Sequence, residues 1–103
     1  MEVLSIMTSS IFEDDEKGRC YLCGSYESAY NPIELHHVFG GPDRKVSDRL
    51  GLVVHLCRNC HDYVHGKDGA STMNYLHTKG QMLYEEKIGT REQFRKEFRG
   101  SYL

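Results

Sequence analysis

Two Cys-x-x-Cys motifs constrain the fold of this 103-residue chain more than any other feature of its sequence. One motif reads CYLC and the other CRNC, and together they contain every cysteine of the chain: Cys20, Cys23, Cys57 and Cys60. Each motif can present two thiolates from a tight turn, and four thiolates at about 2.3 Å complete the tetrahedral shell of a zinc ion. Because four protein ligands leave no position open for a substrate, we expect a structural zinc ion.

A metal that binds the folded state suits a chain of this size and composition. With 39% hydrophobic residues and no Trp, a single small domain buries only a thin hydrophobic core. The N-terminus has no basic segment followed by an apolar run, and no stretch approaches the roughly 20 apolar residues of a membrane span. We therefore expect a cytoplasmic protein without membrane contact, whose cysteines stay reduced. The alternatives are two disulfides or a redox-active cysteine pair. A redox-active pair would require the βαβ pattern of thioredoxin-like sites, which this sequence lacks.

The charge of the chain neither demands nor excludes a nucleic-acid partner. The formal net charge is -2, whereas many nucleic-acid-binding domains carry a strong basic excess. The acidic residues are concentrated in residues 1–19, and the remainder of the chain is close to neutral. A bound divalent metal would add positive charge locally and attract phosphate.

Composition divides the chain into three zones, which predict a small α+β protein. Residues 1–18 form a polar, acidic leader that we expect to be flexible. Residues 19–68 hold all four cysteines and five of the six histidines, and they form the expected zinc-stapled core. Residues 69–103 form a C-terminal extension in which apolar residues recur at helical spacing.

Two helices are expected in this extension. The first would be capped by Ser71 or Thr72. Its buried face would carry Met73, Leu76, Gly80 and Leu83. The second would begin with a capping box between Thr90 and Gln93, bury its phenylalanines in the core, and end at Gly100.

Two pairs of histidines lie near the cysteine motifs. The segment ELHHVFGG contains the adjacent residues His36 and His37, and HDYVH contains His61 and His65, four residues apart. On a helix the second spacing places both imidazoles on one face, where they can chelate a metal. A metal held by imidazoles keeps positions open for substrate oxygen and water, and a further imidazole can accept a proton from that water. Because strand pleating would separate the adjacent pair, we expect them where a strand is strongly twisted or breaks into the GGPDR loop.

In this order, CYLC, ELHHVFGG and LCRNCHDYVH resemble the HNH endonucleases of the ββα-metal (His-Me finger) fold, in the subgroup with a four-cysteine zinc knuckle. The resemblance covers residues 20–65, and the C-terminal segment is similar to the ends of small HNH proteins encoded by phages or prophages. It implies a treble-clef-like ββα-metal core followed by C-terminal helices. It also implies an enzyme that hydrolyses DNA phosphodiester bonds.

The resemblance assigns a role to each histidine of the two pairs. His37 would be the general base, and His36, His61 and His65 would hold one catalytic divalent ion, which could be Mg²⁺, Mn²⁺, Ni²⁺ or Zn²⁺. Double-stranded DNA would be the partner, with phage proteins as further partners, and the protein would act as a monomer or a homodimer.

Three basic residues are candidates for contacts with DNA phosphates. Arg44 and Lys45 follow the paired glycines, and Arg58 lies inside the second cysteine motif. Basic side chains commonly fix a protein on the DNA backbone in this way. The alternative is that each is a solvated surface charge.

One position departs from the pattern of the family, which often places an Asn before the third cysteine to help orient the base. Here Leu52 stands at the expected position, so a backbone carbonyl or His55 would have to orient His37, or activity would be weak. On this interpretation Leu52→Asn would preserve or raise activity. His55 is otherwise expected to be a packed strand residue, and His77 a helical residue outside the site.

Two functions outside this interpretation remain open. A non-catalytic zinc module that binds DNA or protein explains the four cysteines but leaves the two histidine pairs without a role. A structural phage protein with a vestigial nuclease motif would be consistent with the missing Asn.

Overall fold

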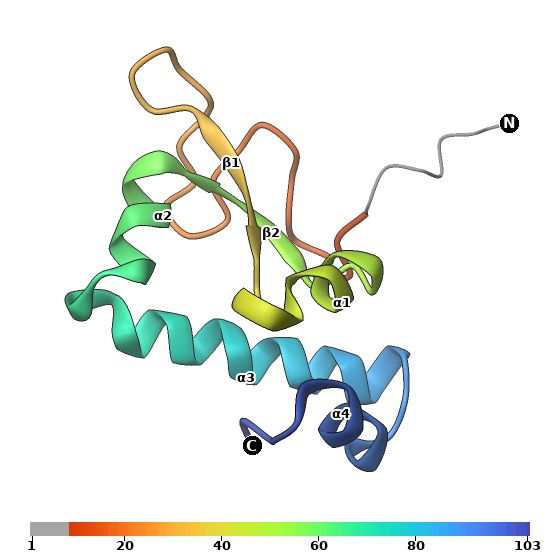
Figure 1. Ribbon diagram of the computed structural model, residues 1–103. Coiled ribbons are helices and arrows are strands. Elements are labelled where there is room, and N and C mark those ends of the chain that lie inside the picture. The colour runs from red at the N-terminus through yellow and green to blue at the C-terminus, as the bar shows by residue number, and fades with distance from the viewer. Residues whose placement is uncertain (1–8) are drawn as a thin grey trace, which may run out of the picture.

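The computed structural model describes residues 9–103 as a small α+β fold with a two-stranded antiparallel sheet and four α-helices (Figure 1). Residues 1–8, the first part of the expected leader, lie outside the described residues. The elements in chain order are β1 (Ile33–His37), η2 (Gly41–Asp43), α1 (Arg44–Arg49), β2 (Val53–Cys57), α2 (Arg58–His65), η3 (Lys67–Gly69), α3 (Ala70–Lys87) and α4 (Arg91–Phe98). The predicted α+β class and the C-terminal helices are confirmed. None of the helices in residues 9–103 is long and apolar enough to cross a membrane.

The sheet places the adjacent histidines at the end of β1. In the register of the two strands, His36 lies opposite Val54 and His37 opposite Val53. Because side chains alternate along a strand, His36 is buried while His37 is partly exposed. As predicted, the pair lies where the strand ends, just before the loop that leads into η2.

The hydrophobic core lies between the sheet and the C-terminal helices. Phe39, two residues after β1, is 2% exposed and packs against Phe94 and Phe98 of α4. Leu76 and Gly80 are buried on α3, as the helical spacing predicted. A Cβ atom at Gly80 would lie 3.1 Å from the Phe39 ring, so glycine allows α3 to approach the segment that follows β1 closely.

Of three predicted helix ends, the structure confirms one and shows that two are wrong. Thr90 forms the predicted capping box with Gln93 at the start of α4. Neither Ser71 nor Thr72 caps α3, because the helix continues directly from the η3 turn and begins at Ala70. The left-handed residue that ends α4 is Arg99, with φ 58°, and not Gly100.

The described part of the leader packs against the core. Phe12 is 1% exposed and belongs to the core cluster. The carboxylate of Asp15 accepts hydrogen bonds from both the backbone N–H and the Nδ1 of His55, each at 2.7 Å. The acidic composition did not reveal that one aromatic and one carboxylate would fix this segment against β2.

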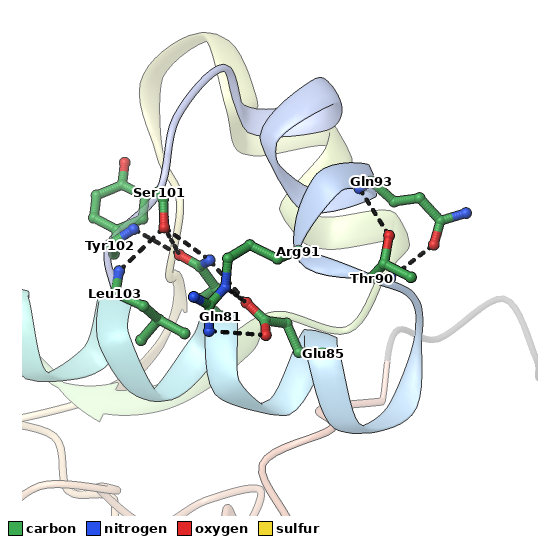
Figure 2. Close-up of polar contacts among 8 residues, drawn as sticks. All are labelled: Gln81, Glu85, Thr90, Arg91, Gln93, Ser101, Tyr102 and Leu103. Carbon is green, nitrogen blue, oxygen red and sulfur yellow. Dashed lines mark hydrogen bonds and ion pairs between the residues drawn. The ribbon is translucent and has the colours of Figure 1, made fainter.

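The C-terminal segment returns to α3 through the side chain of Gln81 (Figure 2). Gln81 is fully buried, and its Oε1 accepts from the backbone N–H of Tyr102 at 2.6 Å. Its Nε2 donates to Glu85 and to the hydroxyl of Ser101. The ring of Tyr102 then packs beside Phe39, with ring centroids 5.3 Å apart. The C-terminal extension therefore supports the segment that directly follows the histidine pair.

Candidate metal centres and catalytic site

The four cysteines of the two motifs converge on one point. The sulfur atoms of Cys20, Cys23, Cys57 and Cys60 all lie within 4.8 Å of one another. Cys23 Sγ and Cys57 Sγ, from different motifs, are 3.8 Å apart. That distance matches the edge of about 3.8 Å that Zn–S bonds of about 2.3 Å give in a tetrahedron. The cluster is compatible with the structural zinc ion that the sequence predicted.

The two motifs have the same local hydrogen bond. The backbone N–H of Cys23 donates to Cys20 Sγ, and that of Cys60 donates to Cys57 Sγ, each at 3.4 Å. The first motif turns at Gly24, whose φ of +79° favours glycine. The second spans the junction of β2 and α2, where Cys57 caps the helix. Each motif is therefore shaped to point its two sulfur atoms in one direction.

The thiols of this cluster differ in how readily they ionise. Hydrogen bonds from Ser25 lower the pKa of Cys23 to about 6. Burial, followed by hydrogen bonds with the neighbouring cysteines, raises the pKa of Cys60. A metal cation would compensate the charge of four thiolates held this close, because metal ligation deprotonates the thiol.

Three histidines from β1 and α2 form a second cluster. One ring nitrogen from each of His36, His61 and His65 lies within 4.8 Å of the other two. The ring centroids are 5.0 to 5.4 Å apart. α2 places His61 and His65 on one face, as predicted, and His61 directly follows the last zinc-cluster cysteine. The fold thus connects the two clusters through a single peptide bond.

His36 is the buried member of this histidine cluster. It is 1% exposed, and its Nε2 is the one buried side-chain nitrogen or oxygen of residues 9–103 without a hydrogen-bond partner. Burial, followed by the charges of His61 and His65, lowers the pKa of His36 to about 3. The imidazole is therefore neutral at physiological pH and offers an unused nitrogen, which is what a metal ligand requires.

Glu34 is a site residue that the sequence analysis did not single out. Its Oε1 lies 2.8 Å from His61 Nδ1, so the ring donates Nδ1–H to the carboxylate and leaves Nε2 for a metal. The hydrogen bond from His61, and then the one from Arg58, hold the pKa of Glu34 below its ordinary value. A carboxylate two positions before a ligand histidine on a strand was the available signal, because alternate strand residues share a face.

His37 borders the same cavity as the histidine cluster. This cavity, of about 290 Å³, is lined by His36, His37, His61 and His65 together with Leu35, Gly40, Gly41 and Arg44. His37 Nε2 lies 3.0 Å from Asp48 Oδ1 on α1. The structure therefore brings the predicted base and the three predicted ligands to one cavity.

The three basic residues proposed for DNA contacts are exposed, with different surroundings. Arg44 lines the histidine cavity, and both Arg44 and Lys45 line a neighbouring cavity that also contains His37. Arg58 donates through Nε to Glu34 at 3.0 Å, so part of its guanidinium is already engaged. Arg44 and Lys45 are consequently nearest to the candidate site.

Leu52 does not occupy a position from which it could orient His37. Its side chain is fully buried in the hydrophobic core, which removes the structural basis for expecting that Leu52→Asn preserves activity. His55 does not orient His37 either, because its Nδ1 is bound to Asp15. His77 stacks on Phe39, with ring centroids 5.3 Å apart, and lies outside the lining of the histidine cavity.

Comparisons of this chain with protein-family models, with curated proteins and with solved structures find no match.

Proposed function

We propose that this protein is a metal-dependent endonuclease of the HNH type, with a ββα-metal core and a structural zinc ion. One observation carries the proposal: His36, whose buried Nε2 has no hydrogen-bond partner, lies beside two further imidazoles, and His37 borders the same cavity. The order β1, β2, α2, with a cysteine pair at the junction of β2 and α2, is consistent with the treble-clef-like arrangement that the family resemblance implies.

The proposed catalytic ion would be held by His36, His61 and His65. When bound, such an ion stabilises negative charge on the phosphate in the transition state and on the leaving 3′ oxygen. The neutral imidazole of His36 and the hydrogen bond from His61 to Glu34 help to prepare this set of ligands.

Side chains of the protein carry out proton transfer and DNA binding. His37 accepts a proton from the attacking water as general base. Arg44 and Lys45 contact phosphates beside the scissile bond and fix the DNA backbone over the cavity. Double-stranded DNA is the proposed substrate because the chain resembles a family of DNA endonucleases, and Arg44 and Lys45 lie where they can contact its phosphates.

Plasmid cleavage by the purified protein tests the proposal. Mg²⁺, Mn²⁺, Ni²⁺ and Zn²⁺ are added in turn, and at least one is expected to support nicking. His37→Ala should retain metal and DNA binding while cleavage falls by about 10² to 10⁴, the usual effect of losing a general base. His61→Ala should weaken metal affinity, so excess metal should partly restore its activity but not that of His37→Ala.

The result also separates the enzyme from a non-catalytic zinc module. If the parent cleaves with none of these ions, or if both variants cleave like the parent, the protein is a non-catalytic zinc module that binds DNA or protein and not a nuclease. Glu86→Ala is a control, because it removes an exposed carboxylate on α3 that does not line the histidine cavity.

A further inference from the structure

Asp48 on α1 contacts the proposed general base. Its Oδ1 lies 3.0 Å from Nε2 of His37. The His37 side chain is 12% exposed and that of Asp48 is 45% exposed. Both line a surface cavity of about 530 Å³ together with Arg44 and Lys45. The Asp48 carboxylate therefore lies at the surface while holding a largely buried ring.

The position of Asp48 is fixed by its neighbour Ser47, which is fully buried. Ser47 Oγ donates to the carbonyl of Leu52 at 2.6 Å and accepts from the N–H of Phe39 at 3.2 Å. Leu52 directly precedes β2, and Phe39 follows the end of β1. Because Ser47 ties α1 to both strand ends, Asp48 is held beside His37 by the fold and not only by their mutual attraction.

This hydrogen bond determines where the His37 ring carries its proton. A carboxylate can only accept, so the ring must donate through Nε2–H. In a neutral imidazole the lone pair then resides on Nδ1. The same side chain also lines the cavity of the histidine cluster. His37 thus borders Asp48 in one cavity and the candidate metal ligands in the other.

We propose that Asp48 is a positioning residue: it accepts Nε2–H of His37 and makes Nδ1 the nitrogen that takes the proton from the attacking water. This rests on the proposed endonuclease function. The water proton moves to Nδ1, the water oxygen forms a bond to phosphorus, and the bond from phosphorus to the 3′ oxygen breaks. The proton then returns to solvent, and the 3′ oxygen takes a proton from water.

Three variants test this role: Asp48→Ala, Asp48→Asn and the control Glu86→Ala, which removes one exposed carboxylate on α3. Asp48→Ala should lower kcat by about 10- to 100-fold, because a base that is no longer oriented loses part of the roughly 10²- to 10⁴-fold rate gain that general-base catalysis contributes. KM, the affinity for the added divalent ion and the thermal midpoint should stay unchanged. The kcat of Asp48→Asn should lie between those of the parent and Asp48→Ala, since the Asn amide can accept a hydrogen bond from the ring or donate one to it. Glu86→Ala should behave as the parent.

Histidine-selective ¹H–¹⁵N NMR of the zinc-bound protein, without a second metal, provides a readout independent of cleavage. The parent should show His37 protonated at Nε2 with a hydrogen-bonded proton resonance, which Asp48→Ala should lose. Protonation at Nδ1 in the parent, or cleavage by Asp48→Ala at the rate of an active parent, would overturn the positioning role. If none of the four divalent ions supports cleavage by the parent, the nuclease function is refuted, and the catalytic part of this proposal is refuted with it. The NMR result separates that failure from an incorrect assignment of the ring proton.

Discussion

Replacing His36 with Leu should make the protein more stable when no divalent ion is added. His36 is 1% exposed and its Nε2 has no hydrogen-bond partner among the described residues. A buried polar group left without a partner costs about 1–3 kcal/mol of folding free energy, and an apolar side chain of similar size removes that cost. For a domain of this size, each kcal/mol corresponds to roughly 4–8 °C in the thermal midpoint.

The same substitution should remove the stabilisation that a divalent ion provides. An ion that binds only the folded state adds about 2.7 kcal/mol at 100 times its dissociation constant. The parent should therefore gain stability as Ni²⁺ or Mn²⁺ is added and reach or exceed the variant, whose midpoint should not move. Thermal unfolding followed by circular dichroism, on protein that retains its cysteine-bound zinc, measures both effects.

The exposed member of the cluster supplies the matched control. His65→Leu should lose the response to divalent ions without the gain in stability, because His65 is already exposed to solvent. The reasoning fails if His36→Leu is less stable than the parent without added ion. It also fails if the thermal midpoint of His36→Leu rises with Ni²⁺ as much as that of the parent.

Four further predictions concern the cysteine cluster, Glu34, His36 and Leu52. Elemental analysis of the purified protein should find one tightly bound zinc ion per chain. Cys57→Ser should lose both the zinc ion and cooperative unfolding, and a folded protein without zinc would contradict this prediction. Glu34→Ala should lower divalent-ion affinity by about 10- to 100-fold in a competition titration, because His61 loses its orienting carboxylate; an unchanged affinity would show that Glu34 does not support the ligand. Because the pKa of His36 is lowered to about 3 in the folded protein, below about pH 6.5 the unfolded chain binds a proton that the folded protein does not, and the free energy of unfolding falls with the pH. The parent should therefore lose up to about 1.4 kcal/mol per pH unit between pH 6.5 and 5.5, and His36→Leu should lose less in parallel denaturant titrations. Leu52→Asn should cost about 3–5 kcal/mol in the same titrations, because it places an amide in the apolar core; wild-type stability would contradict the core position.

The sequence alone determined the parts of the protein that depend on local spacing. Two residues between cysteines define a turn that presents two thiolates, and the spacing of His61 and His65, four residues apart, places both on one face of a helix. The capping box at Thr90 and the burial of Leu76 and Gly80 on α3 were predictable for the same reason, whereas the burial of Gln81 and Tyr84 was not. Each of these features depends on backbone geometry within about two helical turns.

The tertiary structure decided which distant residues meet. The pairing of Asp48 with His37 and of Asp15 with His55 depends on how α1 and the leader pack, and no local pattern reports such contacts. Leu52 could be placed in sequence relative to the third cysteine, but only the packed core shows that its side chain points away from the site. Burial likewise made His36 differ from His37, although the two are adjacent and chemically identical. Solvent exclusion and long-range contacts arise only when the whole chain has folded, so the protonation state and the partner of each histidine belong to the tertiary structure.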